Sequence, residues 1–254
     1  MKFITGNSFK NMANYVLDES GFRNNKEPDT NISTYFVKTD YIHEFFNSSL
    51  LPKTTFNLIT HNSDHNINHN HSKYLEYIFL NKWFAQNVNH EHSKLIPIPI
   101  GIANEEWPHG DTKTLQLVID KSCKKKRLMY SNFNLSTNTK QREYCLQYIK
   151  PEYVENNVTF ETYLQHTAES YFSICPLGNG IDSHRIWESL YLRTVPIVEE
   201  TYNISYLQRS LNLPIVIIKK WNELPNLDLN IKLYNNLIDS FNSNILTTTN
   251  SMLL

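Results

Sequence analysis

The segment from Tyr171 to Val198 holds the residues whose types and spacing best suit chemistry, in the order YFSICPLGNGIDSHRIWESLYLRTVPIV. Its first apolar residues predict a strand over Tyr171–Cys175 that ends at Pro176. The Gly178-Asn179-Gly180 run then permits a tight turn and a close approach of the backbone to a ligand. We therefore expect a strand, a glycine loop and a helix in succession.

The helix predicted after this loop begins with side chains that suit an anion. Asp182 or Ser183 can cap its N-terminus, where unpaired N–H groups and a partial positive charge favour a phosphate. His184 and Arg185 lie in the first turn, and an arginine fork can bind two phosphate oxygens. Glu188 lies within one turn of both and can accept hydrogen bonds from ribose hydroxyls. The alternative is a solvated salt-bridge cluster on a helix without a ligand.

Short β-branched and aromatic runs alternate with helical patterns along the chain. The predicted strands are Thr34–Val37, Thr55–Thr60, Leu95–Ile100, Arg127–Asn132, Tyr171–Cys175, Thr194–Val198 and Ile215–Ile218. The predicted helices are Tyr41–Leu50, Lys73–Gln86, Lys113–Ser122, Lys140–Ile149, Phe160–Ser170, His184–Leu192, Ser205–Leu211 and Ile231–Asn242. This alternation predicts βαβ units, parallel sheets and an α/β fold.

A break in the chain is expected around Pro99–Thr112, within a stretch rich in proline and glycine. We predict two Rossmann-like lobes, over residues 1–110 and 111–254, with a cleft between them. The alternative is one continuous doubly wound sheet with a long loop.

The composition excludes several classes of protein. The 254 residues carry a formal net charge of −1, which argues against a nucleic-acid binder. Cys123, Cys145 and Cys175 have no metal-ligand spacing and are interpreted as free thiols in a reducing compartment. The N-terminus lacks a sustained apolar run, and no stretch reaches the roughly 18 apolar residues that span a bilayer. We therefore expect a cytoplasmic protein without a transmembrane segment.

The same residues resemble the exostosin-type glycosyltransferases of family 47, especially the shorter members related to ribitol-phosphate xylosyltransferase. The likeness is carried by CPLGNGIDSHRIWESLYLRTVPIV and continues in four further stretches of the chain. These are THNSDHN, KWFAQNV, PIPIGIANEEWPHG and YSNFNLSTNTKQR. The resemblance covers most of the span from Phe56 to Val198. It implies a two-lobed GT-B fold, transfer with inversion, no obligatory metal, and a nucleotide-sugar donor held mainly by the C-terminal lobe. The N-terminal lobe would then face the acceptor.

Carried over by position, the resemblance implies a set of donor-site residues. It places the diphosphate at Gly178, Asn179, Gly180, Ser183, His184 and Arg185, and the ribose at Glu188. The loop Ser131–Asn134, with Asn132 in it, and Arg142 would face the phosphates from the other side of the cleft. The alternative for Arg142 is an ordinary surface cation on an amphipathic helix. The short N-terminal lobe and the undistinctive tail after Val198 leave acceptor recognition the least transferable part.

An inverting transfer needs a base for the acceptor hydroxyl. Asp64 and His61 are the candidates, because they follow the strand Thr55–Thr60 and ligand groups gather beyond the carboxyl ends of strands. Glu105 and Glu106 are held in reserve. The alternatives are an Asx turn at Asp64 and a purely structural role for the two glutamates.

A histidine-rich loop is the other candidate for chemistry. His61, His65, His69 and His71 match no zinc signature and have no supporting cysteine, so a solvated loop is the preferred interpretation. Trp83 and Phe84 are expected to lie on the predicted helix over Lys73–Gln86 and to pack into the protein core.

The sequence therefore predicts a glycosyltransferase that moves a sugar from a nucleotide diphosphate donor, with UDP expected, to a carbohydrate acceptor. Two alternatives stay open: a GDP-sugar enzyme similar to fucosyltransferases, and a module that binds a nucleotide or sugar without turnover. A metal hydrolase built on the histidines is disfavoured. No obligatory cofactor is expected.

Overall fold

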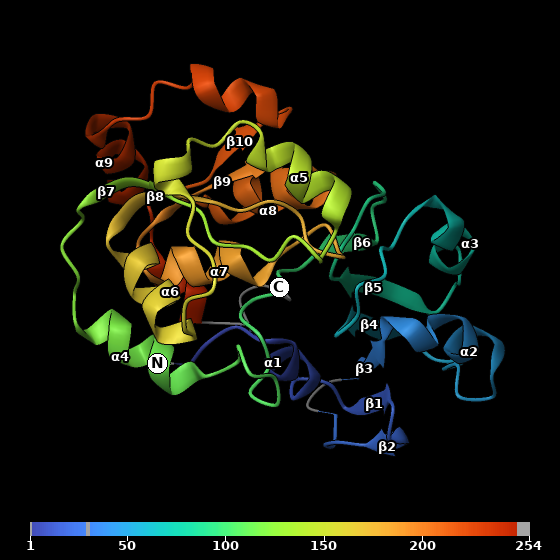
Figure 1. The fold of residues 1–254 in the computed structure, drawn as a ribbon. Helices are drawn as coiled ribbons and strands as arrows, with labels where there is room; N and C mark the ends of the chain where they lie inside the picture. Colours follow the sequence, from blue (N-terminus) through green and yellow to red (C-terminus); the bar gives the residue numbers. More distant parts are fainter. Residues whose placement is uncertain (1, 29–30, 248–254) are drawn as a thin grey trace.

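The computed structural model describes residues 2–28 and 31–247, which form two β-sheets with helices around them (Figure 1). The first sheet has six strands in the order β2-β1-β3-β4-β5-β6, and the second has four in the order β10-β9-β8-β7. All the described pairings are parallel except that between β1 and β2. The α/β class predicted from the sequence is confirmed, and the alternative of one continuous sheet is wrong.

Apolar side chains pack on both faces of the six-stranded sheet, except at the exposed edge strand β2. Its strands are β1 (Tyr15–Asp18), β2 (Gly21–Asn24), β3 (Ser33–Lys38), β4 (Phe56–His61), β5 (Leu80–Ala85) and β6 (Leu95–Pro97). Three short helices accompany it, α1 (Gly6–Lys10), α2 (Ile42–Asn47) and α3 (Ser72–Leu75). Alternation along the strands separates two cores: Leu58 and Trp83 pack with Phe45 of α2, whereas Ile59 and Phe84 pack with Phe9 of α1.

The four-stranded sheet has helices on both faces, as Rossmann-like folds do. Its strands are β7 (Arg127–Tyr130), β8 (Ser170–Ile174), β9 (Val195–Glu199) and β10 (Val216–Ile218). The helices of one face are α4 (Thr112–Asp120), α6 (Phe160–Ala168), α7 (His184–Tyr191) and α8 (Tyr202–Leu211), which share one core. The helices of the other face are α5 (Thr139–Leu146) and α9 (Ile231–Asp239).

The start of the chain crosses from the first sheet to the second. The Ile4 N–H donates to the Tyr191 hydroxyl at 2.8 Å, and that hydroxyl donates to the Leu246 carbonyl at 2.6 Å. The Ile102 N–H also donates to the Ile4 carbonyl at 2.9 Å. The first residues are therefore tied both to α7 and to the segment that joins the two sheets.

The main error of the sequence prediction lies at Lys73–Gln86, where a helix was expected. The helix α3 covers only Ser72–Leu75, and Leu80–Ala85 is the strand β5. Trp83 and Phe84 lie in the core as expected, but they lie on a strand. A short apolar run fits either structure, and β5 is buried on both faces, so no alternation separates the two possibilities.

Other predicted elements are shorter than expected or were missed. The strand predicted over Leu95–Ile100 ends at Pro97, since Pro97 and Pro99 lack the N–H that a strand ladder needs. The elements α1, β1 and β2 were not predicted. The predicted division at residue 110 falls between the two sheets and stays a prediction. Cys123, Cys145 and Cys175 are free thiols.

Candidate functional site

The glycine loop, residues 176–183, leaves the carboxyl end of β8 and leads into α7. Asn87, which follows β5 of the other sheet, holds this loop in place. Its Oδ1 accepts from the Asp182 N–H at 3.0 Å, and its Nδ2 donates to the Ser63 carbonyl at 3.2 Å. A Cβ on Gly180 would lie 2.4 Å from Asn87 Nδ2. The loop therefore needs glycine at 180 because the backbone passes so close to Asn87.

Asp182 joins the segment between the sheets to α7. Its buried carboxylate accepts from the Ile100 N–H at 2.9 Å, the Ser183 N–H at 2.8 Å and the Trp187 Nε1–H at 3.0 Å. Burial raises the pKa of Asp182 to about 6, although these hydrogen bonds oppose the shift. Asp182 was expected as a possible helix cap, but the capping position belongs to Ser183.

The N-terminus of α7 presents donors that the described residues leave unsatisfied. Ser183 makes no side-chain capping bond, and its buried Oγ has no partner among residues 2–28 and 31–247. Within the same part of the chain, no hydrogen bond uses the N–H groups of His184 and Arg185. These donors lie at the positive end of the helix, so the local structure favours an anion.

Two arginines flank the glycine loop, and backbone carbonyls orient both of them. Arg142 of α5 donates through Nε to the Leu177 carbonyl at 3.0 Å and through Nη1 to the Asn134 carbonyl at 2.6 Å. Arg185 donates through Nε to the Asn132 carbonyl at 2.8 Å. Burial, reinforced by the charge of Arg185, lowers the pKa of Arg142 to about 10.

These contacts show how Asn132 and Arg142 are held, while their expected contact with the phosphates stays a prediction. The loop Ser131–Asn134 orients the two guanidinium groups through its carbonyls. Arg142 is only 5% exposed, so it is not an ordinary surface cation. No carboxylate in the described part of the chain forms an ion pair with Arg142 or Arg185. The site thus holds two neighbouring positive charges that form no ion pair with a described carboxylate, and Glu188 is the carboxylate whose charge acts on Arg185.

Glu188 lies one turn into α7, three residues after Arg185. Its Oε2 accepts from the Tyr163 hydroxyl at 2.6 Å, and burial raises its pKa. The Arg185 guanidinium lies 5.9 Å from the centroid of the Tyr163 ring and opposes the rise in the pKa of Glu188. Tyr163 therefore fixes the carboxylate beside Arg185.

Asp64 approaches the glycine loop from the first sheet. The Asn179 Nδ2 donates to Asp64 Oδ2 at 3.1 Å, which brings together two residues that the sequence analysis placed in one site. His184 lies close to the same carboxylate, and its Nδ1–H donates to the Gly101 carbonyl at 2.8 Å. Burial lowers the pKa of His184, so the ring is neutral and Nε2 carries its lone pair.

His61, the other candidate base, is only 1% exposed. Its Nε2–H donates to the Pro99 carbonyl at 3.1 Å, and its Nδ1 accepts from the Asn62 N–H at 2.7 Å. Burial lowers its pKa to about 4. Both ring nitrogens are thus used within the protein, which argues against His61 as a base for an acceptor.

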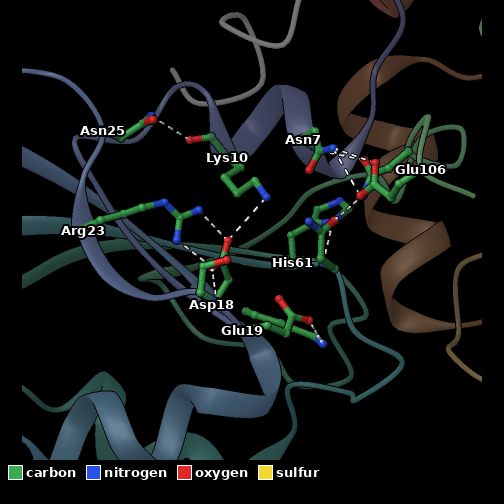
Figure 2. A network of polar contacts seen from close by, with 12 residues as sticks. Asn7, Lys10, Asp18, Glu19, Arg23, Asn25, His61 and Glu106 are labelled. Atoms are coloured by element: carbon green, nitrogen blue, oxygen red, sulfur yellow. Dashed lines mark hydrogen bonds and ion pairs between the residues drawn. The ribbon is translucent and has the colours of Figure 1, made fainter.

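The reserve candidates lie apart from the glycine loop. Glu106 accepts from Asn7 Nδ2 of α1 at 3.1 Å, in the network of polar contacts that includes His61 (Figure 2). Glu105 accepts from the Thr112 hydroxyl at the start of α4, at 2.9 Å. Both carboxylates line a cavity of about 840 Å³ between α1 and α4.

The histidines of the histidine-rich loop do not form a cluster that could bind a metal ion. His65 lies 3.7 Å from Asp40, and His71 contacts Asn68. Among residues 2–28 and 31–247, no group of three or more His, Cys, Asp or Glu side chains could hold a metal ion. The structure therefore gives the metal-hydrolase interpretation no support.

Two contributors to the site were missed from the sequence. Asn87 directly follows the segment Lys73–Gln86, which was wrongly predicted to be a helix. Its position after the strand β5 could therefore not be recognised. Tyr163 was included in a correctly predicted helix, but no spacing rule connects it to Glu188. A correct prediction of β5 would have placed Asn87 beside the end of β4 and its loop.

Comparison with known proteins is consistent with this geometry and points to a class of enzyme. The family model described as the RXYLT1 C-terminal domain matches residues 118–236, which include the glycine loop, α5 and α7. This match relates the chain to a family of glycosyltransferases.

The curated relatives are more specific. Ribitol-5-phosphate xylosyltransferase 1 of Danio rerio is 27% identical over 37% of this chain and 25% of its own length. The Homo sapiens protein of the same name is 26% identical over 28% of this chain and 19% of its own length. The chain thus matches a quarter or less of these relatives. Within residues 2–28 and 31–247, no helix is both long and apolar enough to cross a membrane.

Proposed function

We propose that this protein is a glycosyltransferase that uses a nucleotide diphosphate sugar, with UDP as the nucleotide. The observation that carries the proposal is the pair Arg142 and Arg185, which backbone carbonyls orient beside the glycine loop and which form no ion pair with a described carboxylate. Two like charges held together cost stability, so their arrangement favours an anionic ligand that offsets their repulsion. Because the relatives are xylosyltransferases, the anion that we propose is the diphosphate of a nucleotide sugar.

The proposed roles follow from the positions of the donors. The N–H groups at the start of α7, the Ser183 hydroxyl and the two guanidinium groups bind the diphosphate. The same groups stabilise the negative charge that develops on the leaving diphosphate as the sugar departs. Glu188, fixed by Tyr163, accepts hydrogen bonds from the ribose hydroxyls.

Asp64 is the proposed base. It is exposed beside Asn179 at the mouth of the loop, where a carboxylate oxygen can take the acceptor proton. Transfer with inversion in a GT-B arrangement of an exostosin-like enzyme needs the base on the sugar face opposite the leaving diphosphate, and Asp64 is proposed to fill that role. His184 is proposed to use its unprotonated Nε2 to accept a hydrogen bond from the donor or acceptor.

The names of the relatives suggest the first substrates to test, UDP-xylose as donor and ribitol 5-phosphate as acceptor. Thermal unfolding should be measured with UDP-xylose, UDP-glucose, UDP-galactose and GDP-fucose, because a ligand of the folded state raises the midpoint. Release of UDP with and without acceptor then measures turnover.

Each outcome has a distinct meaning. Stabilisation by UDP-sugars together with UDP release supports the proposal. Stabilisation by GDP-fucose alone would favour the fucosyltransferase-like alternative, and stabilisation without release would favour a binding module. No stabilisation by any of the four would refute a nucleotide-sugar site.

A further inference from the structure

Trp107 differs from the other three tryptophans of the chain because its side chain is exposed to solvent. Trp83, Trp187 and Trp221 are 0% exposed, whereas Trp107 is 57% exposed. Burying an indole is worth a few kcal/mol to a folded protein. Single exposed apolar side chains are common on protein surfaces, so the case for binding rests on the surroundings of Trp107.

Backbone hydrogen bonds hold the turn that contains Trp107, residues 104–110. The Trp107 N–H donates to the Asn104 carbonyl at 3.0 Å, and the Gly110 N–H donates to the Trp107 carbonyl at 2.8 Å. A Cβ on Gly110 would lie 1.9 Å from the Asn104 carbonyl oxygen, so the turn closes tightly on itself. These contacts present the indole from a defined turn, and this limits the entropy that binding must overcome.

A series of rings connects Trp107 to the proposed donor site. The Trp107 and His109 rings are stacked at 29°, with centroids 6.4 Å apart, and the His109 and His184 rings are 5.8 Å apart. His109 also lies within electrostatic reach of Arg185 and Glu188, and burial lowers its pKa, so its ring is neutral. The series thus connects the indole to His184, the first residue of α7, through one intervening ring.

Trp107 follows two residues that line a cavity, although its own ring is not part of that lining. Glu105 and Glu106 precede it directly and line the cavity of about 840 Å³, together with Asn7 and Lys113. A cavity of this size is in the range of small-molecule sites. An exposed indole that follows these two glutamates in the chain fits a ligand with an apolar face and a rim of hydroxyls.

We propose that Trp107 is the platform of the acceptor subsite and that it binds a carbohydrate ring. The C–H face of a pyranose would lie on the indole, and its hydroxyls would donate to Glu105 and Glu106. A protein partner fits less well, because one exposed indole is far smaller than a stable interface. This inference rests on the proposed glycosyltransferase function, since that function supplies the reason for an acceptor.

Fluorescence quenching by acrylamide tests the subsite directly. Because the other tryptophans are buried, the quenchable emission belongs to Trp107, and Trp107→Phe should remove it. With UDP at saturation, methyl β-D-xylopyranoside or methyl β-D-galactopyranoside at tens of millimolar should reduce the quenching constant by about half or more. Unchanged quenching with both pyranosides would overturn the proposal. Protection by ribitol 5-phosphate alone would also overturn it, since that ligand has no ring.

Saturation-transfer NMR provides the second measurement. Trp107→Ala should weaken pyranoside binding by about tenfold, whereas Trp107→Phe should keep most of it because the platform remains. Ile78→Ala is the matched control, since Ile78 is 81% exposed and lies outside the candidate site. Equal binding by Trp107→Ala and the parent would refute the platform.

Donor hydrolysis separates the two proposals. If the parent releases UDP from a UDP-sugar and Trp107→Ala does so at the same rate, the donor site stands independently of Trp107. If the parent neither binds nor hydrolyses any nucleotide sugar, the proposed function fails, whatever the indole does.

Discussion

Replacing Arg185 with alanine should separate donor binding from folding. In the folded protein its Nε donates to the Asn132 carbonyl at 2.8 Å, and no described residue binds its two terminal nitrogens. Losing this one hydrogen bond should cost about 0.5–1.5 kcal/mol of unfolding free energy. The variant also removes the repulsion between Arg185 and Arg142 and the attraction between Arg185 and Glu188, and these two changes oppose each other. The variant should therefore fold.

The cost to donor binding should be larger. A hydrogen bond between a guanidinium and a phosphate contributes about 1.5–3 kcal/mol, which corresponds to a loss of about 10-fold to 150-fold in affinity. The loss should apply to UDP and not to uridine, since uridine has no diphosphate. Arg185→Lys should give an intermediate affinity, because an ammonium keeps the charge but not the planar fork.

Isothermal titration calorimetry of UDP and uridine measures both affinities directly. Arg209→Ala is the matched control, since Arg209 is an exposed cation near the end of α8. If Arg185→Ala binds UDP as the parent does, or if uridine loses as much affinity as UDP, then the guanidinium does not contact the diphosphate and the assigned site is wrong.

Three further predictions test the surroundings of the site. Gly180→Ala should lower the free energy of unfolding by about 1–3 kcal/mol, because its Cβ would lie 2.4 Å from Asn87 Nδ2. Combining it with Asn87→Gly should recover part of this loss in a double-mutant cycle measured by urea unfolding. Additive losses would show that the two residues do not collide. Glu188→Ala should weaken UDP binding more than tenfold but leave the affinity for 2′,3′-dideoxy-UDP nearly unchanged, and an equal loss for both nucleotides would exclude a ribose contact. The pKa of His61 is about 4 in the folded protein against an ordinary 6.5, so below pH 6.5 the unfolded chain takes up a proton that the folded protein refuses. Relative to His61→Gln, the parent should therefore lose about 3 kcal/mol of unfolding free energy between pH 7 and pH 4, and parallel stability curves would contradict the buried neutral ring.

Local sequence was sufficient to predict most of the second sheet. The strand β8, the glycine loop and α7 follow from an apolar run, a glycine turn and a helical pattern that are contiguous in the chain. The expected neighbours of the loop depended on positions far away in the sequence. Asp64 was chosen because it follows a strand, and the structure places it against Asn179.

The error at Lys73–Gln86 shows where this reasoning fails. A strand such as β5 is identified by its partners β4 and β6 as much as by its own residues. Once β5 had been assigned to a helix, Asn87 could not be recognised as the residue that holds the glycine loop. His61 failed as a candidate base for a related reason, since its burial depends on α1, a helix that was not predicted.

The sequence by itself determined the α/β class, the glycine loop and the chemical character of the side chains that begin α7. These properties depend on residues close together in the chain, where periodicity and turn chemistry act. Only the tertiary structure decided which groups remain available to a ligand. It buried Asp182 among three hydrogen-bond donors, used both nitrogens of His61, left the two arginines without an ion pair among the described residues and kept Trp107 in solvent. Those outcomes depend on hydrogen bonds and burial between segments as many as 115 residues apart, as for Asp64 and Asn179, and no local pattern encodes them.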